Sequence, residues 1–162
     1  MTDKKAVDRR PIGAAFLLAQ LGSHGARRFN ERVAEIGLTA PDAGLLRKIA
    51  SDPGVSQQSL AGHLGVMPSR MVALVDGLEA KGMVERRRST EDRRNYALHL
   101  TERGRQALGE LSRIAAEHEE SLCAALSKEE RAQLKELCRR IAEQQGLTAG
   151  VHPGYGQMGR RK

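Results

Sequence analysis

The sequence contains very few aromatic side chains. Its 162 residues include no tryptophan, two phenylalanines and two tyrosines. A core without large rings has to be built from aliphatic side chains, and such a composition suits a protein made mainly of helices. The length corresponds to one domain-sized unit that is large enough to bury such a core.

Cysteine is also scarce. Cys123 and Cys138 stand far apart, and neither belongs to a CxxC pair or has a histidine at metal-ligand spacing. The pattern gives no disulfide framework and no structural zinc signature, so we expect no metal and no cofactor in a protein of the reducing cytoplasm. We interpret both cysteines as apolar residues of a helical interface, and keep as an alternative a redox-responsive regulator that acts through them.

Long apolar runs are missing too. No stretch approaches the ~20 apolar residues that a membrane helix requires, so we expect no membrane partner. Arg9-Arg10 precedes the apolar run 12–21 as in a twin-arginine signal, but Asp8 and Pro11 flank the pair poorly and no A-x-A-like cleavage site follows. The sequence offers no Ser/His/Asp, Cys/His or phosphate-loop arrangement, so we predict that it is not an enzyme.

Positive charge is in excess, with 27 lysines and arginines against 20 acids and a net charge of +7. A basic balance favours a polyanionic partner, but many basic proteins carry only solvated charge, so the total does not identify the partner. The position of the charge is more informative. It gathers between residues 86 and 94, where five arginines stand against two acids.

The stretch before this basic segment has the pattern of two short helices joined by a tight turn. Ser56 is a suitable N-cap for a helix over 56–64. Pro68 suits the first turn of a second helix over 68–81, which Gly82 ends. This arrangement is typical of a helix-turn-helix, whose second helix lies in the DNA major groove. The residues expected to face the base edges are Pro68, Ser69, Arg70 and Ala73. Of these, Arg70 is able to contact guanine with two hydrogen bonds.

Beyond the second helix the apolar period changes from 3.6 to 2. Tyr96, Leu98 and Leu100 alternate with other residues, and Val84 begins a matching strand. The two strands and their basic tip form a wing over 85–96, which would be attracted to phosphates or to a narrow minor groove. The arginines of the wing that are candidates for DNA contact are Arg86, Arg88, Arg93 and Arg94.

Amphipathic helices flank this DNA-binding lobe, which we place at 38–100. Residues 1–36 contain a polar arm and one long helix, and residues 101–146 contain two further helices. The N-caps expected along the chain are Thr39, Ser56, Thr101 and Ser127. The apolar stripes of the flanking helices have no core of their own, so we expect them to interleave with those of a second subunit. Residues 147–162 have no periodicity and are predicted to be a disordered basic tail.

Several motifs follow one another in a fixed order between residues 60 and 104. They are Leu64-Gly-Val, Leu74-Val-Asp-Gly-Leu-Glu-Ala-Lys-Gly-Met-Val-Glu-Arg, Glu91-Asp-Arg-Arg and Leu98-His-Leu-Thr-Glu-Arg-Gly104. With these motifs the sequence resembles the MarR family of winged helix-turn-helix transcriptional regulators over about residues 11–145. It departs from that family at Met67 and Pro68, where small polar residues are usual.

The resemblance implies a mostly α fold with a small two- to three-stranded antiparallel β wing. It also implies a homodimer that reads a pseudo-palindromic operator in double-stranded DNA, most often as a repressor. It assigns Asp92 and Arg94 a shared role, in which the acid fixes an arginine that touches DNA. Finally, it implies an aromatic or phenolic effector between the dimerisation helices and the lobe, where His24 and His118 are the candidate residues.

These observations together predict a dimeric, sequence-specific DNA-binding regulator with two recognition helices about one DNA turn apart, ~34 to 36 Å. The alternative from a different class is a winged-helix module that binds an acidic protein partner through the same lobe. Salt dependence separates the two, because several phosphate contacts give a steep loss of affinity with salt at any DNA sequence.

Overall fold

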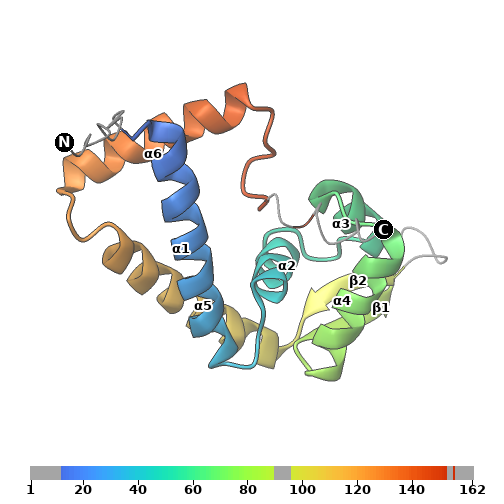
Figure 1. Cartoon of the computed structure of the whole chain (residues 1–162). Helices are drawn as coiled ribbons and strands as arrows, with labels where there is room; N and C mark the ends of the chain where they lie inside the picture. Colours follow the sequence, from blue (N-terminus) through green and yellow to red (C-terminus); the bar gives the residue numbers. More distant parts are fainter. Residues whose placement is uncertain (1–11, 90–95, 153–154, 156–162) are drawn as a thin grey trace, which may run out of the picture.

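The computed structural model describes residues 12–89, 96–152 and 155, and within them the chain forms six helices and two strands (Figure 1). The elements are α1 (Ala14–Ala34), α2 (Ala40–Ser51), α3 (Gln57–Leu64), α4 (Pro68–Ala80), β1 (Val84–Arg88), β2 (Tyr96–Leu100), α5 (Glu102–Leu122) and α6 (Lys128–Gln144). The predicted fold class, mostly α with a small antiparallel wing, is confirmed. None of the helices in the described part of the chain is both long and apolar enough to cross a membrane.

The caps explain why the helices begin where they do. The hydroxyl oxygens of Thr39, Ser56, Thr101 and Ser127 each accept a hydrogen bond from a backbone N–H in the first turn of the helix that follows. All four N-caps were predicted from the sequence. At the other ends, Gly65 and Gly82 adopt φ of 64° and 69°, a left-handed conformation that ends α3 and follows α4.

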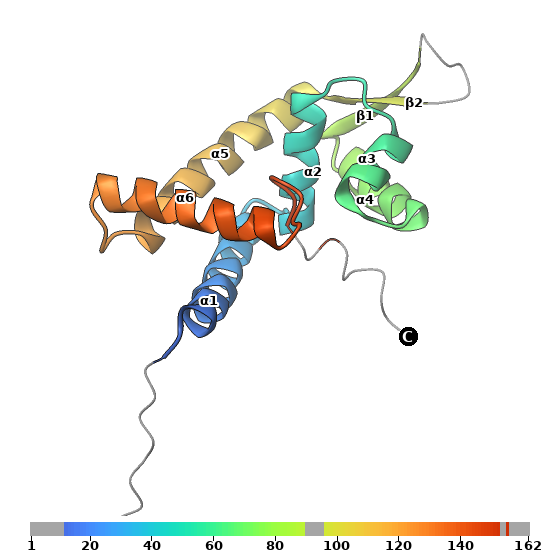
Figure 2. The ribbon, with the colours of Figure 1, turned by 90° about the horizontal axis from the view of Figure 1, so that it is seen from above.

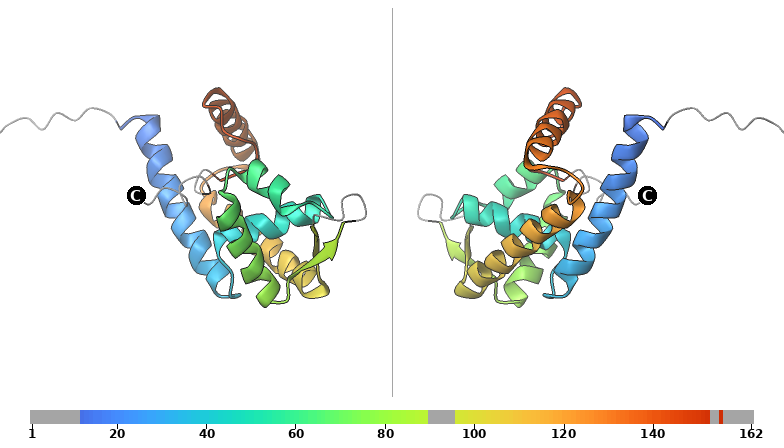
Figure 3. Two further views of the ribbon diagram at one scale, coloured as in Figure 1. Left: turned by 90° about the vertical axis from the view of Figure 1, so that its right-hand side faces the viewer. Right: turned by 90° about the vertical axis from the view of Figure 1, so that its left-hand side faces the viewer.

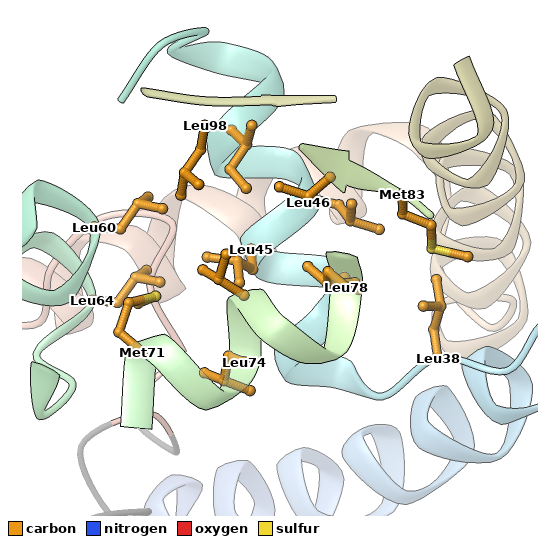
Figure 4. Packing of buried hydrophobic residues seen from close by; sticks show 14 of the residues in the cluster. Leu38, Leu45, Leu46, Leu60, Leu64, Met71, Leu74, Leu78, Met83 and Leu98 are labelled. Carbon is orange, nitrogen blue, oxygen red and sulfur yellow. The ribbon is translucent and has the colours of Figure 1, made fainter. Parts of the chain in front are cut away.

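The lobe made by α2, α3, α4 and the two strands contains the core, and the start of α5 packs against it. The core is almost entirely aliphatic, as the shortage of aromatic residues predicted (Figure 4). Its largest fully buried side chains include Leu45, Leu46, Ile49, Leu60, Met71, Leu78, Leu98 and Leu111. Each such side chain contributes about 1.5–3 kcal/mol through removal from water, so the lobe is held mainly by this cluster.

The wing is fixed to the lobe at its base. β1 and β2 are antiparallel, with Val84 opposite Leu100 and Arg88 opposite Tyr96. The backbone N–H of Leu98 donates to the carbonyl of Val55, and that of Gly54 donates to the carbonyl of Leu98, at 3.0 and 2.9 Å. Strand β2 is therefore tied both to β1 and to the segment between α2 and α3.

Outside the lobe, α1 and α6 leave large apolar side chains uncovered. Both helices project from the lobe to the same side (Figures 1 and 3). No residue of α6 is buried, and only Gly25 and Val33 of α1 are. The exposed large apolar residues of the two helices are Phe16, Leu17, Leu18, Leu21, Leu134, Leu137 and Ile141.

The C-terminal segment differs from the expected disordered tail at Val151 and Tyr155. Val151 is half-buried against the core, and Tyr155 is only 6% exposed. The Tyr155 hydroxyl donates a hydrogen bond of 2.7 Å to the carbonyl of Pro41 at the start of α2. The expectation rested on missing periodicity, which cannot reveal that one ring finds a place in the core of a distant element. Arg160, Arg161 and Lys162, the basic residues of the predicted tail, lie outside the described residues.

Candidate nucleic-acid interface

Helix α4 is buried along one face and exposed at its beginning. Met71, Leu74, Val75 and Leu78 face the core. The side chains that this leaves on the exposed face include the four predicted major-groove residues, Pro68, Ser69, Arg70 and Ala73. The N-terminal end of a helix carries partial positive charge, so this end of α4 also favours phosphate. Pro68 contributes no N–H to it, and the N–H of Arg70 donates to the carbonyl of Met67 at 2.9 Å.

Two apolar residues were not predicted for this surface. Met67, which precedes α4, is 62% exposed, and Val72 within α4 is 41% exposed. As the N-cap of α4, Met67 makes no side-chain capping bond. Exposed apolar groups beside an arginine are able to contact the methyl group of thymine. In the sequence, both could have been recognised as large apolar residues that lie outside the buried stripe of α4.

The wing carries basic residues whose surroundings differ. Arg88 is exposed at the end of β1. Asp92, Arg93 and Arg94 lie outside the described residues, so their placement stays a prediction. Figure 2 shows β1 and β2 extending to one side of α3 and α4.

Arg86 does not behave as the open DNA contact that the sequence suggested. Its side chain is 18% exposed, and its guanidinium contacts the carboxylates of Asp76 and Glu79 on α4. Its Nε also donates to Oε1 of Gln57 on α3, at 2.7 Å. The reason is strand alternation, since Arg86 stands opposite the buried Leu98 on the face of the wing that meets the lobe. Arg86 therefore joins the wing to both helices of the helix-turn-helix.

A second cation holds the far end of α4. Lys81, the C-cap of α4, donates from Nζ to the carboxylate of Asp42 at 2.9 Å. Asp42 is buried, and the same carboxylate accepts the backbone N–H of Thr39 at 3.0 Å to complete the capping box of α2. Together with Arg86, this contact fixes the C-terminal half of α4, whereas Pro68, Ser69, Arg70 and Ala73 stay exposed at its beginning.

The two histidines proposed for an effector site lie where α1 meets α5. His118 is half-buried, and its ring lies 5.6 Å from the ring of Phe29, measured between centroids. Burial lowers the pKa of His118, and the nearby Arg32 and Arg28 lower this pKa further. His24 is exposed on α1. Arg32 is paired with Glu117 on α5. The two rings are therefore in one neighbourhood that contains both cations and carboxylates and is only partly covered by a single chain.

Two cavities in the described part of the chain lie away from these histidines. One of 380 Å³ is bounded by α2, β2 and α5, with Ile49, Arg87, His99 and Arg105 among its lining residues. Another of 430 Å³ lies between the end of α1, Met83 and α5. Neither is lined by His24 or His118. Across residues 12–89, 96–152 and 155, no three His, Cys, Asp or Glu side chains come together in a way that could hold a metal ion.

The two cysteines are free thiols on different elements. Cys123 is half-buried at the C-cap of α5, and Cys138 is exposed on α6. The predicted burial of both in a helical interface is thus not met within one chain and depends on a second subunit.

The helix-turn-helix, the two-stranded sheet beside it and the exposed start of α4 define a winged helix-turn-helix DNA-binding protein. The chain belongs to the MarR family of transcriptional regulators. The model of that family matches residues 38–96, which span the lobe from α2 to the start of β2.

Known proteins agree with this assignment. The chain is 38% identical over 112 residues to a protein of Thauera aromatica assigned as transcriptional regulatory protein for the hcr operon, covering 69% of this chain and 68% of the relative. The repressor CouR bound to a 23-mer DNA duplex is similar in structure, with a TM-score of 0.72, 30% identity and coverage of 80% of this chain and 92% of CouR. The Mycobacterium tuberculosis protein Rv2887 in complex with salicylic acid is also similar, with a TM-score of 0.64, 26% identity and coverage of 84% and 99%.

Replacing Arg86 by methionine tests its contact with the lobe. The change leaves Asp76, Glu79 and Gln57 without a shared donor, so we expect a loss of about 1–2 kcal/mol in the free energy of unfolding. Arg87→Met is the matched control, because Arg87 is 61% exposed and pairs with Glu85 on the surface. We expect the control to change stability by less than ~0.5 kcal/mol. Denaturant unfolding measures both, and equal midpoints for the two variants would show that Arg86 does not hold the wing to α4.

Proposed function

We propose that the protein is a homodimeric repressor that places the start of α4 in the major groove of a pseudo-palindromic operator. The observation that carries this proposal is the division of α4. Arg86 and Lys81 hold its C-terminal half through carboxylates, whereas Pro68, Ser69, Arg70 and Ala73 present its N-terminal half to the surface. A reading surface that is exposed but rigidly supported is what base recognition requires. The DNA-bound structure of CouR supports the same use of this fold.

The residues of the surface take different roles in this proposal. Arg70 contacts a guanine, and Ser69 bonds to a base or a phosphate. Pro68 and Ala73 pack against base edges, together with Met67 and Val72. On the wing, Arg88, Arg93 and Arg94 bind phosphates or the minor groove, and Asp92 orients Arg94. Arg86 positions the wing and does not itself read DNA.

The uncovered stripes of α1 and α6 support the dimer. Phe16 is 58% exposed and Leu137 is 52% exposed, and both belong to rows of apolar residues on their helices. Monomeric proteins rarely leave such rows in water, and a two-fold contact between copies would cover them. The dimer would also set two α4 helices about one DNA turn apart.

The contact between α1 and α5 is our proposed effector site. The half-buried ring of His118, the ring of Phe29 and the cation of Arg28 suit a small aromatic acid, for which Arg32 would have to exchange its partner Glu117. The salicylic acid complex of Rv2887 supports this chemical class. A second subunit that covers α1 would close the site further.

Two other functions are less well supported. A module that binds an acidic protein would use the same basic wing, but it would not need an exposed Ser69-Arg70 pair at a helix start. A redox-responsive regulator would use the thiol of Cys138, which is exposed in the single chain, or that of Cys123, which is half-buried. We propose that the protein acts by binding and not by catalysis, and that it does so in the cytoplasm.

The DNA function is tested by selecting fragments from random duplex DNA with the purified protein. We expect a palindromic site that binds far more tightly than bulk DNA. Arg70→Ala should cost about 1–3 kcal/mol on that site and relax the preference at one base pair in each half, because it removes a base contact. Arg88→Ala should weaken all sequences alike and reduce the slope of affinity against salt by about one. A protein that enriches no sequence and keeps only weak attraction to DNA would favour the protein-binding alternative.

The dimer is tested by placing a charge in the apolar stripe of α6. Leu137→Asp puts a carboxylate where a second subunit would pack, so we expect a shift from dimer to monomer in sedimentation analysis and loss of palindrome binding. Ala132→Asp introduces the same charge on the opposite side of α6 and should leave the dimer intact. If both variants remain dimeric, the stripe of α6 is not in the interface.

The effector site is tested by calorimetric titration with salicylate. We expect binding that weakens at least tenfold in His118→Ala, with His63→Ala on α3 as an exposed control. Because the pKa of His118 is lowered, its ring is neutral at pH 7, so affinity for the carboxylate should rise as the pH falls below the ordinary histidine range of about 6.5. Equal affinities for the two variants would remove His118 from the site.

A further inference from the structure

Tyr155 occupies a built site on the DNA-binding lobe. Its ring is buried, its hydroxyl donates to the carbonyl of Pro41 at 2.7 Å, and Val151 packs against the core four residues earlier. Burial and the nearby carboxylate of Asp42 raise the pKa of Tyr155 to about 12. The phenol is therefore held as a neutral donor at every physiological pH.

The site exists because residue 44 is a glycine. A Cβ at Gly44 would lie 2.1 Å from the Tyr155 hydroxyl oxygen and 3.1 Å from Cζ, so the ring of Tyr155 would have to leave its present position. A glycine in the middle of a helix lowers helix stability, so its presence within α2 needs a reason. Close approach of the Tyr155 ring supplies that reason.

Two hydrogen bonds and one peptide bond link the docked ring to α4. Its acceptor, Pro41, is next to Asp42, and Asp42 accepts a hydrogen bond from Lys81 at the end of α4. In the sequence, Tyr155 comes after α6, and no residue of α6 is buried. In the described part of the chain, Val151 and Tyr155 are the residues after α6 that pack against the core.

We propose that Tyr155 is a positioning residue, which ties the C-terminal end of α6 to α2 and thereby restricts where α4 sits relative to the dimerisation helices. In a dimer, this restriction limits the distance between the two recognition helices. Tyr155 then sharpens the choice of half-site spacing without touching DNA. The inference rests on the proposed DNA-binding function.

Docking is tested first, without DNA. In a Tyr96→Phe background Tyr155 is the only tyrosine, and the chain has no tryptophan, so the intrinsic emission reports on this ring alone. We expect weak quenching by acrylamide, and quenching that is several-fold stronger after Gly44→Ala, because the new Cβ expels the ring. Gly109→Ala is the matched control, since it adds the same methyl group to α5 with no atom within 4 Å. Unchanged quenching in Gly44→Ala would overturn the docking site.

The positioning role is tested on operators whose half-sites are moved apart or together by one and two base pairs. The wild type and Gly109→Ala should prefer one spacing. Gly44→Ala and Tyr155→Ala should lose at least threefold of that preference while still binding the best site, and Tyr155→Phe should lie between them because it lacks only the bond to Pro41. A merely structural role would lower stability but leave the spacing preference unchanged.

The outcomes separate this inference from the function on which it rests. If Gly44→Ala frees the ring but the preference for spacing stays at the wild-type value, the positioning role is wrong and the repressor stands. If the wild type binds no operator at any spacing, the proposed function fails and the positioning role fails with it. The quenching result would still decide whether Tyr155 docks against Gly44.

Discussion

The buried carboxylate of Asp42 is the polar contact that joins the start of α2 to the end of α4 within the aliphatic lobe. Among the described residues, Asp42 is the one charged residue whose side chain is buried. An ionised group removed from water is stable only with charged or hydrogen-bonding partners. Asp42 has such partners in the N–H of Thr39 and the ammonium group of Lys81. The first contact begins α2, and the second fixes the end of α4. The recognition helix is therefore attached to the helix that carries the core of the lobe.

The acidic residues of α4 are also paired, and its charged residues are unevenly distributed along the helix. Its acidic residues, Asp76 and Glu79, lie toward the C-terminal half, and both contact Arg86 of the wing. Arg70 stands in the first turn, and that turn contains no acidic residue. Negative charge is thus kept away from the end of α4 that would approach phosphates. A net positive charge favours DNA in general, but this local sorting favours one orientation on it.

Most of the fold was predictable because it depends on local signals. Thr39, Ser56, Thr101 and Ser127 cap helices through their own side chains, and the change of period after Gly82 marks the wing. The exposed residues at the start of α4 were predictable for the same reason, since helical periodicity decides which side is buried.

The parts that were not predictable depend on contacts between distant elements. Strand alternation shows that Arg86 and Arg87 face opposite ways, but not that α4 provides two carboxylates on one of those sides. Tyr155 has no periodic neighbours, and Gly44 on its own resembles any helix glycine. Only their close approach, with the ring in the space that a side chain on residue 44 would fill, explains both. Residues that position a site are therefore harder to find from sequence than residues that form its surface.

Because α1 and α6 are only weakly buried, an effector could change their arrangement relative to the lobe. An effector changes DNA binding only if it prefers one arrangement of the lobe and the dimerisation helices over another. The contacts that set this arrangement include those of α1 with α5 around Phe29 and His118, and that of the segment after α6 with α2 through Tyr155. The aliphatic core inside the lobe is too well packed to deform in response to a small ligand. A ligand at the contact of α1 with α5 would therefore move the lobe as a unit, and the docked Tyr155 would oppose that motion.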